Sequence, residues 1–184
     1  MVKEAAGPDP RWSSVSPVVP GSGRLRPLGL NEVEITGGFW FERQGVNSSA
    51  TLAHCQEWME RLSWVGNFRA AVEGRMPEAR RGMQFSDSDV YKLMEAMTWE
   101  VGRSGSADAD QRFEGLVQVI APAQEADGYL NTCFGRSGQG ARYSDLEWGH
   151  ELYNYGHLFQ AAVARARTHG HDEFVDIALR AADH

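Results

Sequence analysis

Apolar residues recur every three or four positions through most of the chain after residue 47, which is the spacing of one face of an α-helix. Asn47, Ser48 and Ser49 are residue types that cap helices. The stripe that follows them predicts a helix of about four turns, and a second apolar set begins at Trp64. The residues of the first stripe are Leu52, Cys55, Met59 and Leu62.

Four further helical segments follow from the same spacing. One is capped by Ser86 and ends in the Gly102 to Gly105 segment, and the next begins at Asp108 or Asp110. A long helix opens at Ser144 or Asp145 and stops at His169-Gly170. The last starts at Asp172. The stripes that define the first, second and last of these are Val90, Leu93, Met94, Met97 and Val101; Phe113, Leu116, Val117 and Ile120; and Phe174, Ile177, Ala178 and Ala181.

The beginning of the chain has a different pattern. Residues 1–30 hold most of the prolines and show no apolar period, which predicts a flexible N-terminal arm. Glu32 to Thr36 alternates polar and apolar residues as a short strand does, before Gly37-Gly38 interrupts it. The pattern therefore predicts an all-α domain over residues 31–184, with about six helical segments in pairs joined by short connections and little strand.

Composition excludes some classes of function. A formal net charge of −7 with a pI near 5.4 disfavours a nucleic-acid partner, since such binding needs Lys and Arg to neutralise phosphates. The sequence contains no apolar run long enough for a membrane span or a signal peptide, so we expect a cytoplasmic protein without a membrane partner. The two cysteines, Cys55 and Cys133, lie outside any zinc-binding spacing and are interpreted as unrelated, partly buried thiols.

Candidate chemistry is concentrated in HELYNYGH, from His150 to His157. A zinc-protease helix needs histidines four residues apart, but Asn154 stands at that position. His150 and His157 are two helical turns apart, about 10 Å, too far to share one metal ion. Positions 150, 153, 154, 157 and 161 form a polar stripe, and positions 152, 156, 159, 163 and 166 form another, which holds Leu152, Phe159 and Val163. The polar stripe suits either a polyhydroxylated ligand or internal packing, and the pattern alone leaves both open.

Several motifs together resemble one known family. FSDSDVYKLMEA, QEADGYLNTCF and HELYNYGHLFQAAVA, followed by a Thr-His-Gly turn and AADH, are similar to the N-terminal part of the β-L-arabinofuranosidase-like glycoside hydrolases. GGFWFERQ and NFRAAVEG are similar to the same family and stand in the same order. The resemblance covers roughly Val33 to His184.

The resemblance implies a six-hairpin (α/α) toroid followed by β-sandwich domains, and an enzyme that releases a terminal β-L-arabinofuranosyl unit with retention. It also implies a zinc-bound cysteine thiolate as nucleophile and a glutamate as acid/base, all located beyond residue 184. Cys55 and Cys133 are therefore not expected to be nucleophile or ligand, and we expect no catalytic residue, metal ligand or cofactor within this chain. By the resemblance, His150 donates hydrogen bonds to sugar hydroxyls, and Gln56 is a second sugar-binding residue by its spacing before Asn67.

The end of the chain predicts a truncated toroid. The last helix has no Gly, Pro or basic cap, and Asp183 lies in its final turn, where the helix dipole disfavours an acid. Residues 31–184 are then the N-terminal half of a helical toroid, inactive alone, with exposed apolar helix faces through which copies can associate. The alternative is an autonomous helical binding or scaffold domain without catalysis.

Overall fold

The computed structural model describes residue 25 and residues 28–184. Most of the predicted N-terminal arm, residues 1–24, 26 and 27, lies outside the described residues. The described part is helical almost throughout, so the all-α prediction is confirmed. Among these residues, no helix is long and apolar enough to cross a lipid bilayer.

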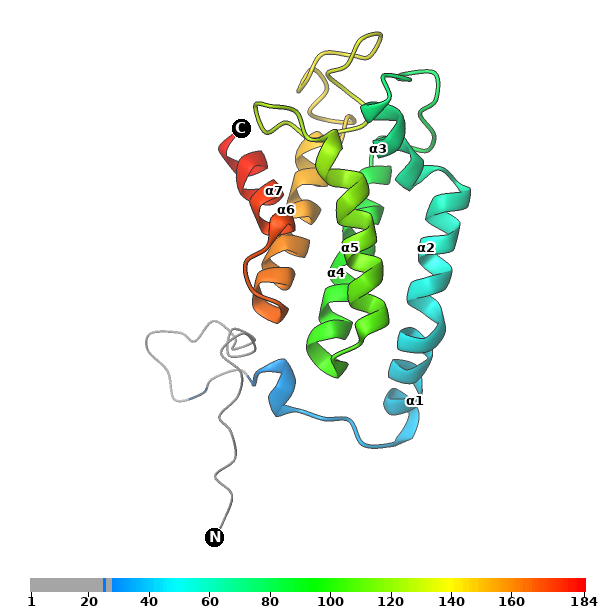
Figure 1. The fold of residues 1–184 in the computed structure, drawn as a ribbon, viewed down its shortest axis with the longest axis vertical. Helices are drawn as coiled ribbons and strands as arrows, with labels where there is room; N and C mark the ends of the chain where they lie inside the picture. The colour runs from blue at the N-terminus through cyan, green and yellow to red at the C-terminus, as the bar shows by residue number, and fades with distance from the viewer. Residues whose placement is uncertain (1–24, 26–27) are drawn as a thin grey trace.

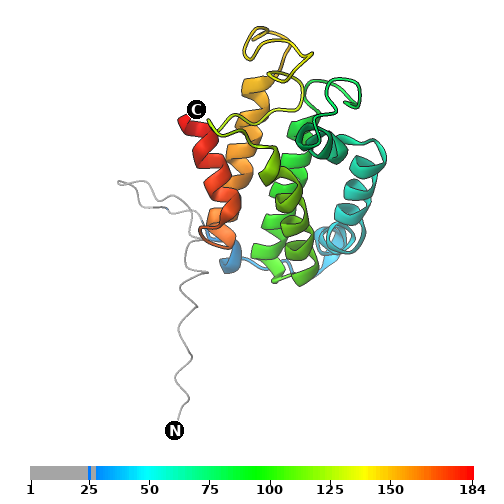
Figure 2. The ribbon, with the colours of Figure 1, turned by 45° about the horizontal axis from the view of Figure 1, so that its top comes forward.

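The helices form a double layer of antiparallel pairs. α4 and α5 make one pair, α6 and α7 make the next, and α4 packs most extensively against α6 (Figure 1). In both views the long loops and the N-terminal ends of α4 and α6 lie at the same end of the bundle (Figure 2). The elements are η2 (Leu30–Glu32), α1 (Gly38–Val46), η3 (Asn47–Thr51), α2 (Leu52–Arg61), α3 (Trp64–Val72), α4 (Ser86–Ser104), α5 (Ala107–Ile120), η4 (Ala121–Ala123), α6 (Glu151–Thr168) and α7 (Glu173–Asp183).

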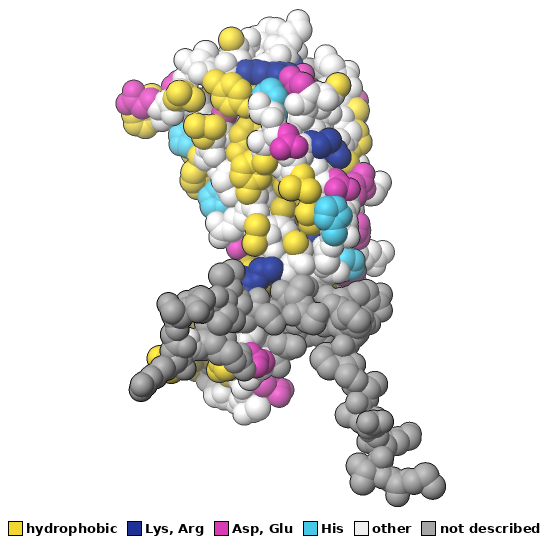
Figure 3. Space-filling view, turned by 90° about the vertical axis from the view of Figure 1, so that its left-hand side faces the viewer, with side chains coloured by type: hydrophobic (Ala, Val, Ile, Leu, Met, Phe, Trp, Pro, Cys, Tyr) yellow, Lys and Arg dark blue, Asp and Glu magenta, His cyan; other side chains and the backbone are white. Residues whose placement is uncertain are grey.

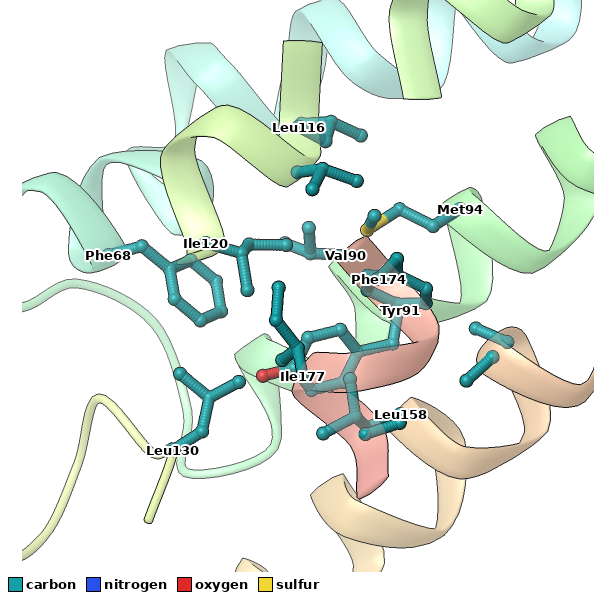
Figure 4. Packing of buried hydrophobic residues seen from close by; sticks show 14 of the residues in the cluster. Phe68, Val90, Tyr91, Met94, Leu116, Ile120, Leu130, Leu158, Phe174 and Ile177 are labelled. Atoms are coloured by element: carbon teal, nitrogen blue, oxygen red, sulfur yellow. The ribbon is translucent and has the colours of Figure 1, made fainter. Parts of the chain in front are cut away.

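One apolar core joins α2 to α7. Most of the residues predicted to form stripes on α4, α5 and α7 are buried in it, which confirms those faces. Ala161 and Ala164 are buried on α6, where their small side chains allow neighbouring helices to approach closely. Figure 4 shows Phe68, Tyr91, Met94, Leu116, Ile120, Leu158, Phe174 and Ile177 converging from five helices.

Two predictions near the N-terminus are wrong. Glu32–Thr36 forms no strand: a 3-10 turn ends at Glu32, and the segment has no strand partner among the described residues. The caps predicted at Asn47 to Ser49 do not start a helix, because α1 continues through a π-helical turn into α2. Ser49 Oγ instead donates to the Gly45 carbonyl, 2.8 Å away.

Three helix starts also differ from the prediction. α5 begins at Ala107 rather than at Asp108 or Asp110. α4 begins at Ser86 with Phe85 in the cap position, a shift of one residue. The long helix does not open at Ser144 or Asp145 but at Glu151. His150 has φ of 58°, in the left-handed region, which a right-handed helix cannot include.

The face of α6 and α7 that points away from α4 and α5 is apolar and open (Figure 3). A groove of about 250 Å³ runs along it, with Val163 and Leu179 exposed at its edges. This confirms the predicted exposure of apolar helix faces. The groove is lined by Phe159, Ala162, Val163, Ala166, Val175, Ala178, Leu179 and Ala182.

Candidate functional site

His150 lies at the N-terminal end of α6, on the side of the bundle that carries the long loops. Its imidazole is flanked by the rings of Phe85 and Tyr153, whose centroids lie 5.5 Å and 5.7 Å away. Nδ1 is 2.5 Å from the Trp148 carbonyl oxygen. Nε2 has no partner among the described residues and is not buried. The ring is thus held on three sides, and one nitrogen faces solvent.

A polar and aromatic cluster continues from His150 along α6. The Tyr153 and His157 rings lie 4.7 Å apart, and Lys92 Nζ on α4 donates to Tyr153 Oη at 2.9 Å and to Asp89 Oδ1 at 3.0 Å. Burial lowers the pKa of Lys92, but the hydrogen bonds to Tyr153 and Asp89 outweigh it and raise the pKa above its ordinary value. Burial lowers the pKa of His157, and the Lys92 ammonium lowers it further. The cluster therefore presents a charged lysine beside a neutral imidazole near pH 7.

The polar stripe predicted on α6 divides into two parts. His150, Tyr153 and His157 meet through ring contacts at the surface. Asn154 and Ala161 point inward and are buried. Asn154 Nδ2 donates to the Gln84 carbonyl at 3.0 Å, which fastens α6 to the loop before α4. Part of the stripe is therefore structural.

Buried hydrogen bonds behind the site hold the surrounding loops. Glu151 accepts from the Tyr129 hydroxyl and from the Tyr143 backbone N–H, the latter at 2.7 Å. Burial and the Glu151 carboxylate raise the pKa of Tyr129, which keeps its hydroxyl a donor. Asp87, in the first turn of α4, accepts from the backbone N–H and the hydroxyl of Thr132 at 2.8 Å and 2.6 Å. The QEADGYLNTCF and FSDSD motifs therefore meet in one buried contact.

Gln56 lies on α2, and its Oε1 accepts a hydrogen bond from Arg112 on α5 at 3.0 Å. No hydrogen bond or ring contact joins Gln56 to His150 among the described residues. The structure thus brings His150 together with Phe85 and Tyr153, and Lys92 joins them through Tyr153, whereas Gln56 lies apart. Phe85 and Trp148 were missed as contacts of His150 because both come from loops, although Phe85 opens the FSDSD motif.

The cysteines are free and partly buried, as predicted. Burial raises the pKa of the Cys133 thiol, the opposite of what a nucleophilic thiolate requires. The described residues contain no group of three His, Cys, Asp or Glu side chains that could hold a metal ion. The zinc implied by the family resemblance therefore has no matching ligand set in this part of the chain.

Hollows elsewhere on the surface do not involve His150. One of about 430 Å³ lies near the far end of α4, and Trp40, Trp99 and Arg43 are among its lining residues. The chemical character of the surface at His150 comes from imidazole, phenol and ammonium groups.

Comparison with known proteins agrees with this arrangement. The family described as "β-L-arabinofuranosidase, GH127 catalytic domain" matches residues 32–184. A non-reducing end β-L-arabinofuranosidase of Bifidobacterium longum subsp. longum is 34% identical over 123 residues, which are 65% of this chain and 18% of that protein.

Solved structures show the same helical arrangement. A GH127 β-L-arabinofuranosidase from Geobacillus stearothermophilus T6 aligns with a TM-score of 0.75 and 31% identity, over 82% of this chain and 25% of that one. A second GH127 β-arabinofuranosidase aligns with a TM-score of 0.74 and 27% identity, over 84% and 26%. The chain thus spans about a quarter or less of the relatives it matches. Its helices are part of an (α/α) toroid, as predicted, and the chain belongs to the GH127 family of β-L-arabinofuranosidase catalytic domains.

Proposed function

We propose that the intact protein is a glycoside hydrolase that removes a terminal β-L-arabinofuranosyl unit with retention, and that this chain supplies one wall of its sugar pocket. Family membership supports the reaction class. The observation that carries the role of this chain is His150, whose ring is held by Phe85, Tyr153 and the Trp148 carbonyl while Nε2 stays open. A fixed imidazole beside an aromatic ring is suited to a furanose, which offers both hydroxyls and C–H groups.

The reacting groups are proposed to come from polypeptide beyond these residues. Zinc would keep a cysteine thiolate deprotonated in the intact enzyme, but Cys133 has the wrong environment and the described residues offer no ligand cluster. This chain alone should therefore bind the sugar weakly and hydrolyse nothing. Gln56 is proposed as a second sugar contact, by family spacing, through its amide Nε2, because its Oε1 already accepts a hydrogen bond from Arg112.

The test is a titration of the chain with methyl β-L-arabinofuranoside, followed by NMR or calorimetry. We expect His150→Ala to weaken binding at least tenfold, equivalent to about 1.4 kcal/mol, with little change in thermal stability because the ring is only partly buried. His171→Ala is the matched control, because this exposed histidine bonds only to Asp176 on α7. No aryl arabinofuranoside should be cleaved by the chain.

An autonomous helical binding or scaffold domain is the alternative, and the single core shared by α2 to α7 favours it. It predicts a monomer with cooperative melting, no detectable sugar binding, and a stability change as the main effect of His150→Ala. Sugar binding that His150→Ala abolishes would exclude it. Cleavage by this chain at the rate of a full-length relative would exclude the division of roles proposed above.

A further inference from the structure

The hydrogen bond between His150 and Trp148 fixes where the imidazole proton lies. A backbone carbonyl can only accept, so Nδ1 of His150 must carry the hydrogen that fills the 2.5 Å contact to Trp148 O. A neutral imidazole has one N–H, and Nε2 is then a bare acceptor facing solvent. This is the reverse of the donor role that the family resemblance implies for His150.

The Trp148 carbonyl is itself held by a tight turn. Asp145 Oδ1 accepts from the Trp148 N–H at 2.8 Å, and the Asp145 carbonyl accepts from the Gly149 N–H at 2.9 Å. A Cβ on Gly149 would lie 2.4 Å from the Asp145 carbonyl oxygen and 3.0 Å from the Phe134 ring, so only glycine allows this closure. His150 follows at once in the left-handed conformation, with φ of 58°.

The turn and the aromatic contacts act on the same ring from different sides. Phe85 and Tyr153 lie at 65° and 85° to the imidazole plane and restrict its rotation. Asp145 is exposed and makes no hydrogen bond to the imidazole, so its influence passes through the Trp148 peptide. The imidazole of His150 is thus oriented by a turn of neighbouring residues, Asp145 to Gly149, before any ligand binds.

We propose that Asp145 is a positioning residue: by holding the Trp148–Gly149 turn it places the proton of His150 on Nδ1 and leaves Nε2 to accept a hydrogen bond from a sugar hydroxyl. The last part rests on the function proposed above. The ligand must then be a sugar with a free hydroxyl that donates a hydrogen bond to His150 Nε2. An O-methyl ether there has no hydrogen to give and should not bind.

The tautomer can be read directly from ¹⁵N spectra of the histidine-labelled chain without any sugar. The measurement is made at about pH 8.5, two units above the ordinary imidazole pKa of about 6.5, and His150 is assigned by the loss of its signals in His150→Gln. We expect a protonated-type Nδ1 and an unprotonated-type Nε2. A proton on Nε2 in the unsubstituted chain overturns the proposal.

Three variants separate Asp145 from general loss of structure. Asp145→Ala should move His150 toward the tautomer mixture of free histidine, and Asp145→Asn should preserve the signature because its amide oxygen can still accept from Trp148 N–H. Gly149→Ala should lose the signature by opening the same turn. Circular dichroism checks that each variant stays folded. An unchanged signature in Asp145→Ala overturns the positioning role.

Methyl β-L-arabinofuranoside is added last. A change in ¹⁵N chemical shift confined to His150 Nε2 supports both the acceptor role of this nitrogen and the proposed sugar pocket. The expected tautomer with no shift supports the positioning role of Asp145 and counts against the proposed function. An equal change in the Nε2 chemical shift with O-methyl ethers of the same sugar overturns the acceptor role alone.

Discussion

Replacing Arg165 with Met should destabilise the fold strongly, since its guanidinium is fully buried at the centre of a charged cluster. Nη1 contacts Asp110 and Nε contacts Asp172, each at 2.6 Å, and Nη2 contacts Glu114. Asp172 also caps α7 by accepting from the Phe174 and Val175 N–H groups. One side chain therefore joins α5, α6 and the start of α7.

The magnitude follows from the uneven burial of the partners. Removing one member of a buried ion pair typically costs about 3–5 kcal/mol because the remaining charge is left uncompensated. Here the carboxylate side chains of Asp110, Glu114 and Asp172 are 34%, 47% and 19% exposed, so water compensates them partly. The contact of the guanidinium with the Phe113 ring, 4.3 Å to the centroid, is also lost. We therefore expect a loss of about 2–4 kcal/mol for Arg165→Met.

Urea unfolding followed by circular dichroism gives the free energies, with Arg61→Met as the control. The Arg61–Glu57 pair is exposed, and its loss should cost less than about 1 kcal/mol. If Arg165→Met costs no more than the control, then repulsion among the three carboxylates and burial already cancel the attraction, and the reasoning fails.

The pH dependence provides a second check on the same variant. Burial raises the pKa of Glu114; Asp172 and Asp110 add to the rise, and Arg165 opposes it. Without Arg165 the folded-state pKa of Glu114 rises further above its unfolded value of about 4.3. A raised acid pKa means that the folded state binds the proton more tightly, so stability falls as pH increases through that range. The deficit of Arg165→Met should therefore be larger at pH 7 than near pH 4.

Two further predictions concern the surface and a tight packing contact. If copies of the chain associate through the α6/α7 groove, Val163→Glu should shift them toward monomer in light scattering, because Val163 lines the groove and is 58% exposed. Leu146 is 68% exposed outside the groove, so Leu146→Glu should leave association unchanged. Equal effects of the two variants would refute association through this face. Gly128→Ala should cost about 3 kcal/mol or more in urea unfolding, since φ is +92° and the new Cβ would lie 2.2 Å from the Arg180 carbonyl oxygen. Gly115→Ala is its control: nothing lies within 4 Å, and a gain of about 0.5–1 kcal/mol is expected.

The sequence predicts helices well where one face enters the core. Val90, Met94 and Met97 recur at helical spacing and are fully buried, so α4 could be placed to within a residue at its start. α1 was missed for the converse reason. None of its residues is buried, so Phe39 and Trp40 form no stripe that a periodicity search can detect.

The contacts of the candidate site were predictable only in part. His150 could be selected because its motif resembles a family, and that resemblance is carried by residues close together in sequence. Phe85 and Lys92 reach the site from α4 and the loop before it, more than fifty residues away. No local pattern links them to His150, because their contact depends on how closely α4 and α6 pack.

The wrong start predicted for α6 and the geometry of the candidate site have one cause. Asp145 is a good capping residue, and its side chain does accept a backbone N–H three residues later, from Trp148. The turn ends at Gly149, whose N–H donates back to the Asp145 carbonyl. The left-handed backbone of His150 then prevents the helix from starting before Glu151. Local propensity favoured a continuous helix, which would bond the Trp148 carbonyl to a backbone N–H within that helix. The interruption frees that carbonyl for His150 Nδ1, so the departure from local preference creates the only feature that orients the imidazole through a hydrogen bond among the described residues.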